Sequence, residues 1–329
     1  MTSKHVGLYS TPAMLEQARA TRDTEPLAWA WAWLNAEEGA FIRQRPAPTP
    51  EDKRAIAPVH KPALSPLAQA LADATAYAYD GDEQRGARAV DALQQAHVGA
   101  DAPDDLHAMM QALAWANAFV LLQAHPALTF AGAWRAGYHQ RVQALMAREG
   151  WLTSCWQVPL RMSLGVLMND DAQARLAVEA YQTHIRDVHA EGYFKTIAEH
   201  KREMGYREQF FAVMALTLAA EMGEGLGLGL WAWDNRGVTL GTALSYAMYY
   251  TFFPDQWRWG DAPTQEEVNA LVREYGAFFE MAYYRTKLLR GIEALLDENR
   301  PFFSPYGGGL TTLTHGLPRP EPKKRGWLW

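Results

Sequence analysis

Hydrophobic and polar positions recur with helical spacing along most of the chain. Apolar residues return every three or four positions, which is the period of an amphipathic α-helix. Short turns with Gly, Pro, Asn or Asp separate most of these segments, and no alternating β-branched run is long enough to indicate a sheet. After two opening helices, the pattern predicts helices over 67–79, 83–96, 104–125, 131–148, 153–168, 171–190, 202–222, 237–253 and 264–297. We therefore expect an all-α protein of about ten to twelve helices.

The N-terminal region carries two helix-start signals. Thr11-Pro12 places an N-cap residue before a first-turn proline, and Thr24-Glu25-Pro26 repeats the arrangement. In the following LAWAWAWLNAEE, the alternating tryptophans could indicate a strand, but the alanine-rich background and the polar tail favour a helix.

The segment 44–66 interrupts this helical pattern with six prolines. Such a segment cannot form a continuous helix, and long loops of this kind are usually functional lids or linkers. Because helical material of the same kind follows, we expect a lid. Lys53, Arg54, His60 and Lys61 give it a basic character suited to closing over an anion. A solvated loop without function is the alternative.

Composition narrows the class of protein. A chain of 329 residues with 49% apolar residues can bury a large core, and we expect a single domain over 1–329. The helices could form an open solenoid or close into a toroid, and the absence of a convincing repeat of about 34 to 47 residues disfavours the solenoid. With a formal charge of -6 and no block of like charges, we expect neither nucleic acid nor a membrane as partner.

The sequence carries only weak signals for targeting to a compartment and for binding a metal or a cofactor. The start MTSKHVGLYSTPAML has no apolar region typical of a signal peptide, so we expect a cytoplasmic protein, or a periplasmic or secreted one if the chain is a processed form. The single Cys155 excludes an intramolecular disulfide, and His184 and His189 are not spaced to share one helix face. GEGLGLGLW follows a helix and not a strand, so it does not indicate dinucleotide binding. We expect no metal and no cofactor.

The stretch 191–222 is the best candidate for a functional centre. It passes from a polar segment into a helix that is apolar on most faces, which indicates an interior helix with polar residues at its entrance. Arg202, Tyr206 and Gln209 fall on one stripe at helical spacing, with His200 just upstream. A guanidinium, a phenol and an imidazole there could bind and deprotonate an anionic sugar. The alternative is that they are interior polar groups satisfied by their neighbours.

Four motifs, in the same order along the chain, resemble the alginate lyase-like family. They are AYAYDGDEQRGARAVDALQQA at 76–96, the run GYFKTIAEHKREMGYREQFFAVMALTLAAEM from Gly192, GLGLGLW after it, and PYGGGLTTLTHG at 305–316. The resemblance implies an incomplete α/α toroid with a central groove for an acidic polysaccharide or oligosaccharide. It also implies cleavage by β-elimination, in which polar groups neutralise the uronate carboxylate and a Tyr or His moves the proton.

Within this resemblance, Arg202 matches the family arginine and Tyr206 matches a tyrosine four residues on. The family's catalytic tyrosine lies seven residues after the arginine, where this chain has Gln209, which cannot act as an acid or base at neutral pH. Leu152, Thr153 and Ser154 stand where the family has Asn-Asn-His. The resemblance implies Arg202 and Tyr206 as catalytic candidates, to which we add His200. We expect Gln209, Tyr193, Trp156, Arg161 and His60 to bind substrate.

Three functions remain open at this point. The first is a divergent polysaccharide lyase acting on a uronate-containing glycan. The second is a carbohydrate-binding or scaffold protein that kept the fold without the chemistry. The third is a glycosidase, which would need two carboxylates facing each other, and Asp234, Glu208 and Glu203 cannot be paired from sequence.

Overall fold

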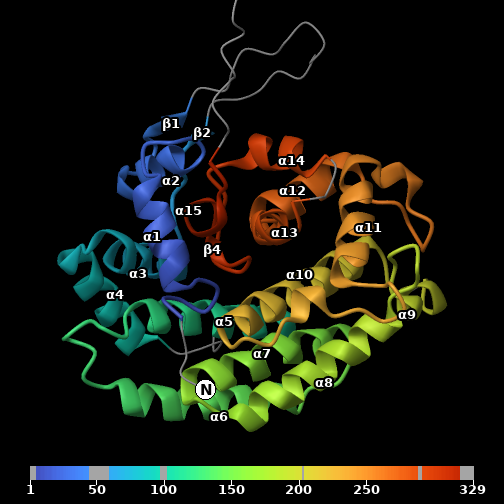
Figure 1. Ribbon diagram of the computed structural model, residues 1–329, viewed down its shortest axis with the longest axis horizontal. Coiled ribbons are helices and arrows are strands. Elements are labelled where there is room, and N and C mark those ends of the chain that lie inside the picture. The colour runs from blue at the N-terminus through green and yellow to red at the C-terminus, as the bar shows by residue number, and fades with distance from the viewer. Residues whose placement is uncertain (1–4, 44–58, 97–101, 202–203, 288–290, 319–329) are drawn as a thin grey trace, which may run out of the picture.

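The computed structural model describes residues 5–43, 59–96, 102–201, 204–287 and 291–318. These residues form fifteen α-helices, two short 3-10 helices and two small two-stranded sheets (Figure 1). The all-α class expected from the hydrophobic spacing is confirmed. The α-helices are α1 (Pro12–Ala20), α2 (Leu27–Asn35), α3 (Pro66–Asp80), α4 (Glu83–Gln95), α5 (Asp105–Leu121), α6 (Ala131–Met146), α7 (Trp151–Met168), α8 (Asp171–Asp187), α9 (Lys195–Glu199), α10 (Tyr206–Gly225), α11 (Leu240–Phe252), α12 (Gln265–Tyr275), α13 (Phe278–Thr286), α14 (Ile292–Asn299) and α15 (Thr311–His315).

Consecutive helices pack as hairpins, and the hairpins curve round so that the first and the last described helices meet. Helix α3 packs on α4 and α5, and α7 packs on α8, α10 and α5. The C-terminal helix α13 packs against both α10 and α15 (Figure 1). Helix α15 packs against both α1 and α2, so the last described helix closes the ring on the first two.

Helix α10 is the interior helix that the sequence predicts. Every residue from Gln209 to Gly223 is buried. A polar side chain on this helix must therefore find its hydrogen bonds inside the protein. The helix begins at Tyr206, with Glu208 reaching back to the backbone N–H of Gly205, and it ends in the glycine-rich exit that the sequence indicates.

The predicted helix 264–297 is wrong as one element, because it is three helices: α12, α13 and α14. Gly276 stands at the first break, where a Cβ atom would lie only 2.5 Å from the carbonyl oxygen of Val272. The second break ends at Gly291, whose φ of +85° favours glycine. Apolar spacing continues across both breaks, so periodicity alone does not reveal them. Such breaks and the five-residue helices α9 and α15 raise the count above ten to twelve.

The two small sheets are antiparallel hairpins. Strand β1 (Phe41–Arg43) pairs with β2 (Val59–His60) on either side of the proline-rich segment, and β3 (Phe303–Ser304) pairs with β4 (Gly309–Leu310). Residues 44–58, on which the lid prediction depends, lie outside the described part of the chain. No helix among the described residues has the length and apolar character needed to cross a membrane.

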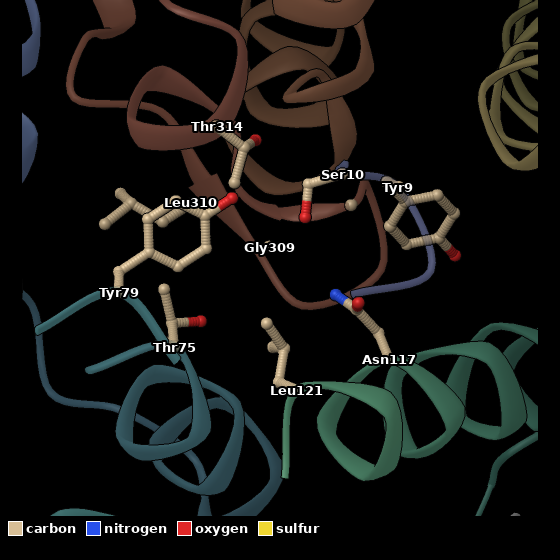
Figure 2. Close-up of a pocket in the computed structure, with 10 residues that line it drawn as sticks. Tyr9, Ser10, Thr75, Tyr79, Asn117, Leu121, Gly309, Leu310 and Thr314 are labelled. Carbon is tan, nitrogen blue, oxygen red and sulfur yellow. The ribbon is translucent and has the colours of Figure 1, made fainter. Parts of the chain in front are cut away.

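A small polar cavity of about 10 Å³ lies where the N-terminal segment, α3, α5 and the β4 hairpin meet (Figure 2). The side-chain oxygen of Asn117 accepts a hydrogen bond of 2.9 Å from the backbone N–H of Leu8 there. This space is about the size of one water molecule, so it is too small for a sugar.

Candidate active site

The tyrosine and glutamine of the predicted stripe are interior groups with satisfied hydrogen bonds. The hydroxyl of Tyr206 donates to the backbone oxygen of Ala247 at 3.1 Å and lies 2.9 Å from Oγ1 of Thr251. Burial raises the pKa of Tyr206. This geometry supports the structural alternative that the sequence left open for Tyr206, because its hydroxyl does not reach a solvent-facing site.

Gln209 also serves the core. Its amide group donates to the backbone oxygen of Gly192, and its side-chain oxygen accepts from the backbone N–H of Phe194, both at 3.1 Å. Gln209 therefore ties the turn before α9 to α10. Arg202, the remaining member of the stripe, lies outside the described residues.

The other predicted site residues have separate neighbours. His200 is exposed and pairs with the backbone oxygen of Thr196, while Arg161 donates to Gln173 at 3.4 Å. The ring of Tyr193 is half-buried between two aromatic rings. Its centroid lies 4.5 Å from that of His189 and 4.7 Å from that of Trp259.

Trp156 is fully buried, and His60 is exposed with its Nδ1 atom 3.1 Å from the backbone oxygen of Gly39. The structure therefore places Trp156 in the core and His60 beside the base of the proline-rich segment. Neither contact by itself makes a substrate site, and the assignments of these residues stay predictions.

A different group of polar side chains does come together, at the start of α5 and the end of α12. Asp104 is the N-cap of α5, and its Oδ1 atom accepts from the backbone N–H of His107 at 2.8 Å. The same oxygen lies 2.9 Å from Nδ1 of His107, and Nε2 of His107 lies 3.2 Å from the hydroxyl of Tyr275. Because a carboxylate only accepts, Nδ1 carries the proton and Nε2 accepts from Tyr275. The result is an Asp–His–Tyr hydrogen-bond chain.

Aromatic rings fix this chain in place. The ring of Tyr306, in the turn between β3 and β4, stacks on that of Tyr275 at 5.9 Å and meets the His107 ring edge-on at 6.4 Å. Phe211 of α10 packs edge-on against Tyr275 with a centroid distance of 5.0 Å. The cluster is thus held by α5, α10, α12 and the β3–β4 hairpin.

The local charges set the protonation states. Burial raises the pKa of Asp104, but its bonds with His107 and the nearby charge of Arg207 outweigh burial and lower it overall. Burial and the neighbouring Glu274 raise the pKa of Tyr275, and Arg207 opposes them only in part. At neutral pH, Asp104 is therefore charged and Tyr275 keeps its proton. Arg207 is exposed on the first turn of α10 and brings a cation to the cluster.

The Alginate lyase family model matches residues 63–257, more than half of the chain. The chain belongs to the alginate lyase family. The structures similar to this family member include two variants of alginate lyase A1-III complexed with tetrasaccharide, each 15% identical and covering 97% of both chains, with TM-scores of 0.69 and 0.71. Alginate lyase A1-III from Sphingomonas species A1 is 17% identical over 96% of this chain and 97% of that one, with a TM-score of 0.66. No curated protein matches the sequence.

This likeness confirms the expected incomplete α/α toroid of the alginate lyase family member. Within that ring, the hydroxyl of Tyr275 bonds the acceptor nitrogen of His107, and the charge of Arg207 acts on both Asp104 and Tyr275. This set can move protons and hold an anion. Sequence analysis missed His107 and Tyr275, because their partnership depends on the fold. The signal available was the Asp104-x-x-His107 spacing at a helix start.

The carboxylates considered for a glycosidase are engaged elsewhere. Oε2 of Glu208 accepts from the backbone N–H of Gly205 at 2.7 Å, and Oδ1 of Asp234 accepts from that of Gly237 at 3.1 Å. Both therefore cap local turns, and Glu203 lies outside the described residues. Among the side chains that the structure describes, no group of three or more His, Cys, Asp or Glu is arranged to hold a metal ion.

Cys155 is not placed as a nucleophile. The thiol is fully buried, and burial raises its pKa. Its sulfur lies 3.5 Å from Nδ1 of His184, which is itself buried in the same core. A thiol that keeps its proton is a poor nucleophile.

Proposed function

We propose that this alginate lyase family member is a polysaccharide lyase that cleaves an acidic, uronate-containing glycan by β-elimination, with His107 and Tyr275 as the acid–base pair. Family membership supports the reaction class. The observation that carries the assignment of the pair is the hydrogen bond of 3.2 Å between Nε2 of His107 and the hydroxyl of Tyr275. It joins a proton acceptor to a proton donor in one chain with Asp104.

The first step removes the proton on C5 of the uronate. That proton is acidic only when the charge of the neighbouring carboxylate is countered, and Arg207 is the exposed cation at this position. Nε2 of His107 takes the proton, and the imidazolium that forms is stabilised by the Asp104 carboxylate on Nδ1. Asp104 thus has the same orienting role as the carboxylate in a Ser–His–Asp triad.

The second step breaks the glycosidic bond. The electron pair left on C5 forms the C4–C5 double bond, the bond from C4 to the glycosidic oxygen breaks, and Tyr275 donates its hydroxyl proton to that oxygen. The raised pKa of Tyr275 suits this role because it keeps the hydroxyl protonated until the leaving group needs the proton.

The third step restores both side chains. The tyrosinate of Tyr275 recovers a proton from Nε2 of His107 across their hydrogen bond. One proton has then left C5, one has reached the leaving oxygen, and neither side chain has changed. The pair therefore needs no proton from solvent to complete a cycle.

Ultraviolet absorbance of newly formed unsaturated uronate tests the proposal. Purified protein is incubated with poly-mannuronate, poly-guluronate, glucuronan, hyaluronan and pectate. A signal on at least one polymer is expected, and silence on all of them would contradict lyase activity on these glycans.

A non-catalytic carbohydrate-binding role is the second candidate. It is favoured by Gln209, which stands at the position of the family's catalytic tyrosine and is used here to bond the core backbone. Binding of one polymer by calorimetry without any absorbance signal would support this candidate.

A further inference from the structure

A second polar cavity lies on elements that do not form the acid–base cluster. It has a volume of about 340 Å³ and opens between the end of α2, the segment after β2, and the facing sides of α3 and α4. In Figure 1 these elements occupy one flank of the ring, away from α10 and α12. Its charged lining residues are Lys61, Asp73, Arg85, Arg88, Glu37 and Glu38.

The cations of this cavity gather around one buried carboxylate. Asp73 is only 2% exposed, and it accepts from Nε of Arg85 at 2.7 Å and Nε of Arg88 at 3.2 Å. Lys61 is 7% exposed and adds a third cation. The other acidic groups, Glu37 and Glu38, are exposed at the rim. The whole lining therefore has three groups of each sign, with the cations around Asp73 and the other two carboxylates at the rim.

Two of the three cations, Lys61 and Arg88, could donate further hydrogen bonds to a ligand. The N–H groups of Arg85 are already engaged, because besides Asp73 it donates to the backbone oxygens of Leu34 and Ala72. The ammonium of Lys61 donates to the backbone oxygen of Ala36 at 2.8 Å, its one hydrogen bond within the described residues, although an ammonium has three N–H groups. Arg88 is 53% exposed at the side chain.

The surroundings of Lys61 would favour a bound anion. Its Nζ atom lies 4.7 Å from the centroid of the Trp33 ring, so part of its surroundings is apolar. Burial and the nearby charge of Arg85 lower the pKa of Lys61, and Asp73 opposes them. An anion bound between Lys61 and Arg88 would accept hydrogen bonds from their remaining N–H groups.

We propose that this cavity binds the carboxylate of a single uronate unit, either a free monosaccharide or the end of a chain. Its volume is near the lower limit of about 300 Å³ for ligand pockets, which suits one sugar. Glu37, Glu38 and Gln69 at the rim can bond sugar hydroxyls, and the two Glu carboxylates would repel the carboxylate of a second uronate. The choice of uronate among carboxylates rests on the proposed function.

Site-specific labelling of lysine tests this proposal without using turnover. The Tyr275→Phe variant is treated with an amine-reactive reagent, and the labelling rates of Lys61 and the exposed Lys195 are measured by peptide mass spectrometry. The probes are glucuronate, mannuronate, glucose, acetate and inorganic phosphate. With a uronate at ten times its Kd, labelling of Lys61 should slow about tenfold, because only unoccupied sites react, and Lys195 should not change.

Each other outcome overturns a defined part of the proposal. If glucose protected Lys61 from labelling as well as a uronate does, the proposed role of the carboxylate would be wrong. Protection by phosphate as strong as that by uronate would assign the cavity to inorganic anions instead of sugars. No protection by any probe, or equal protection of Lys195, would overturn the site itself.

A matched pair of variants completes the test. Arg88→Gln removes one cation from the cavity, and we expect the uronate concentration needed for protection to rise about tenfold, consistent with losing one charged hydrogen bond. Arg22→Gln removes a surface arginine that also pairs with an aspartate but lines no part of the cavity, and it should have no effect. Because labelling does not depend on catalysis, failure here and failure of lyase activity are separate results.

Discussion

The hydroxyl of Tyr275 and the imidazole of His107 share a hydrogen bond of 3.2 Å although 168 positions separate them in the sequence. His107 lies in the first turn of α5, and Tyr275 is the last residue of α12. Closure of the ring of helices brings these two ends together, and Asp104 fixes the orientation of the imidazole. The pair is therefore a product of the fold and not of a local motif.

His107→Gln should remove the base while leaving a side chain that can still bond Tyr275. We expect kcat to fall about 100-fold to 10,000-fold with a small change in KM, since proton transfer is lost and binding is not. Steady-state kinetics on the active polymer measures this. His139→Gln, at an exposed histidine on α6, is the control and should keep full activity. Wild-type kcat in His107→Gln would exclude His107 as the base.

Tyr206→Phe should affect stability but not catalysis. The change removes buried hydrogen bonds to Ala247 and Thr251, so the free energy of unfolding should fall by about 1 kcal/mol. Lyase activity should stay within about twofold of wild type, because the hydroxyl does not reach a solvent-facing site. Denaturant unfolding and the absorbance assay measure the two effects. Collapse of activity in a well-folded Tyr206→Phe protein would restore Tyr206 as the acid/base residue.

Much of the fold could be predicted from the sequence. The unbroken apolar character of 209–223 predicts the interior helix α10, and Thr11-Pro12 predicts the start of α1. The predicted helix 264–297 failed because Gly276 and Gly291 interrupt the backbone without interrupting the apolar spacing. The pattern of apolar side chains indicates which face of a helix is buried. The two breaks depend instead on the backbone conformation and on close contacts at the glycines.

The candidate site could be predicted only in part. Helical spacing correctly puts Tyr206 and Gln209 on one stripe of a buried helix, but it cannot distinguish groups that face a groove from groups bonded inside the core. His107 and Tyr275 each follow an ordinary amphipathic pattern. Their contact depends on how α5 and α12 pack in the closed ring, which no local pattern encodes.

Glu221→Gln should destabilise the protein strongly. Glu221 is 2% exposed and accepts from Nε of Arg285 at 2.8 Å, with Nε2 of His315 lying 3.2 Å away. Removing its charge leaves the guanidinium of Arg285 without its buried carboxylate partner, and we expect the free energy of unfolding to fall by about 3 kcal/mol. Denaturant unfolding measures this.

Arg22→Gln is the exposed comparison for the Glu221 prediction. It breaks the surface pair with Asp80 and should cost less than about 1 kcal/mol. Equal losses in Glu221→Gln and Arg22→Gln would contradict a special role for the buried pair.

Stability should fall as the solution becomes acidic. Burial lowers the pKa of His184 below its ordinary value of 6.5, so the unfolded chain binds a proton more readily than the folded protein. The stability linked to His184 is therefore fully present above pH 6.5 and is lost as the pH falls from there toward the lowered pKa. Burial also lowers the pKa of His5, so His5 contributes to the same loss of stability at acidic pH. Thermal unfolding at a series of pH values measures the trend.

His184→Gln should flatten the dependence of Tm on pH, whatever it does to Tm at neutral pH, because the titrating group is gone. The exposed His200→Gln should keep the wild-type slope. An unchanged slope in His184→Gln would show that His184 does not carry the effect.

The most direct test compares Tyr275→Phe with wild type in the unsaturated-uronate assay, on whichever polymer gives a signal. The phenyl ring keeps the packing against Tyr306 and Phe211, and only the hydroxyl is lost. We predict a loss of kcat of at least about 100-fold with retained polymer binding, while the lost hydrogen bond to His107 lowers the free energy of unfolding by no more than about 1 kcal/mol. Wild-type elimination by a folded Tyr275→Phe protein would contradict the acid–base pair at the centre of the account.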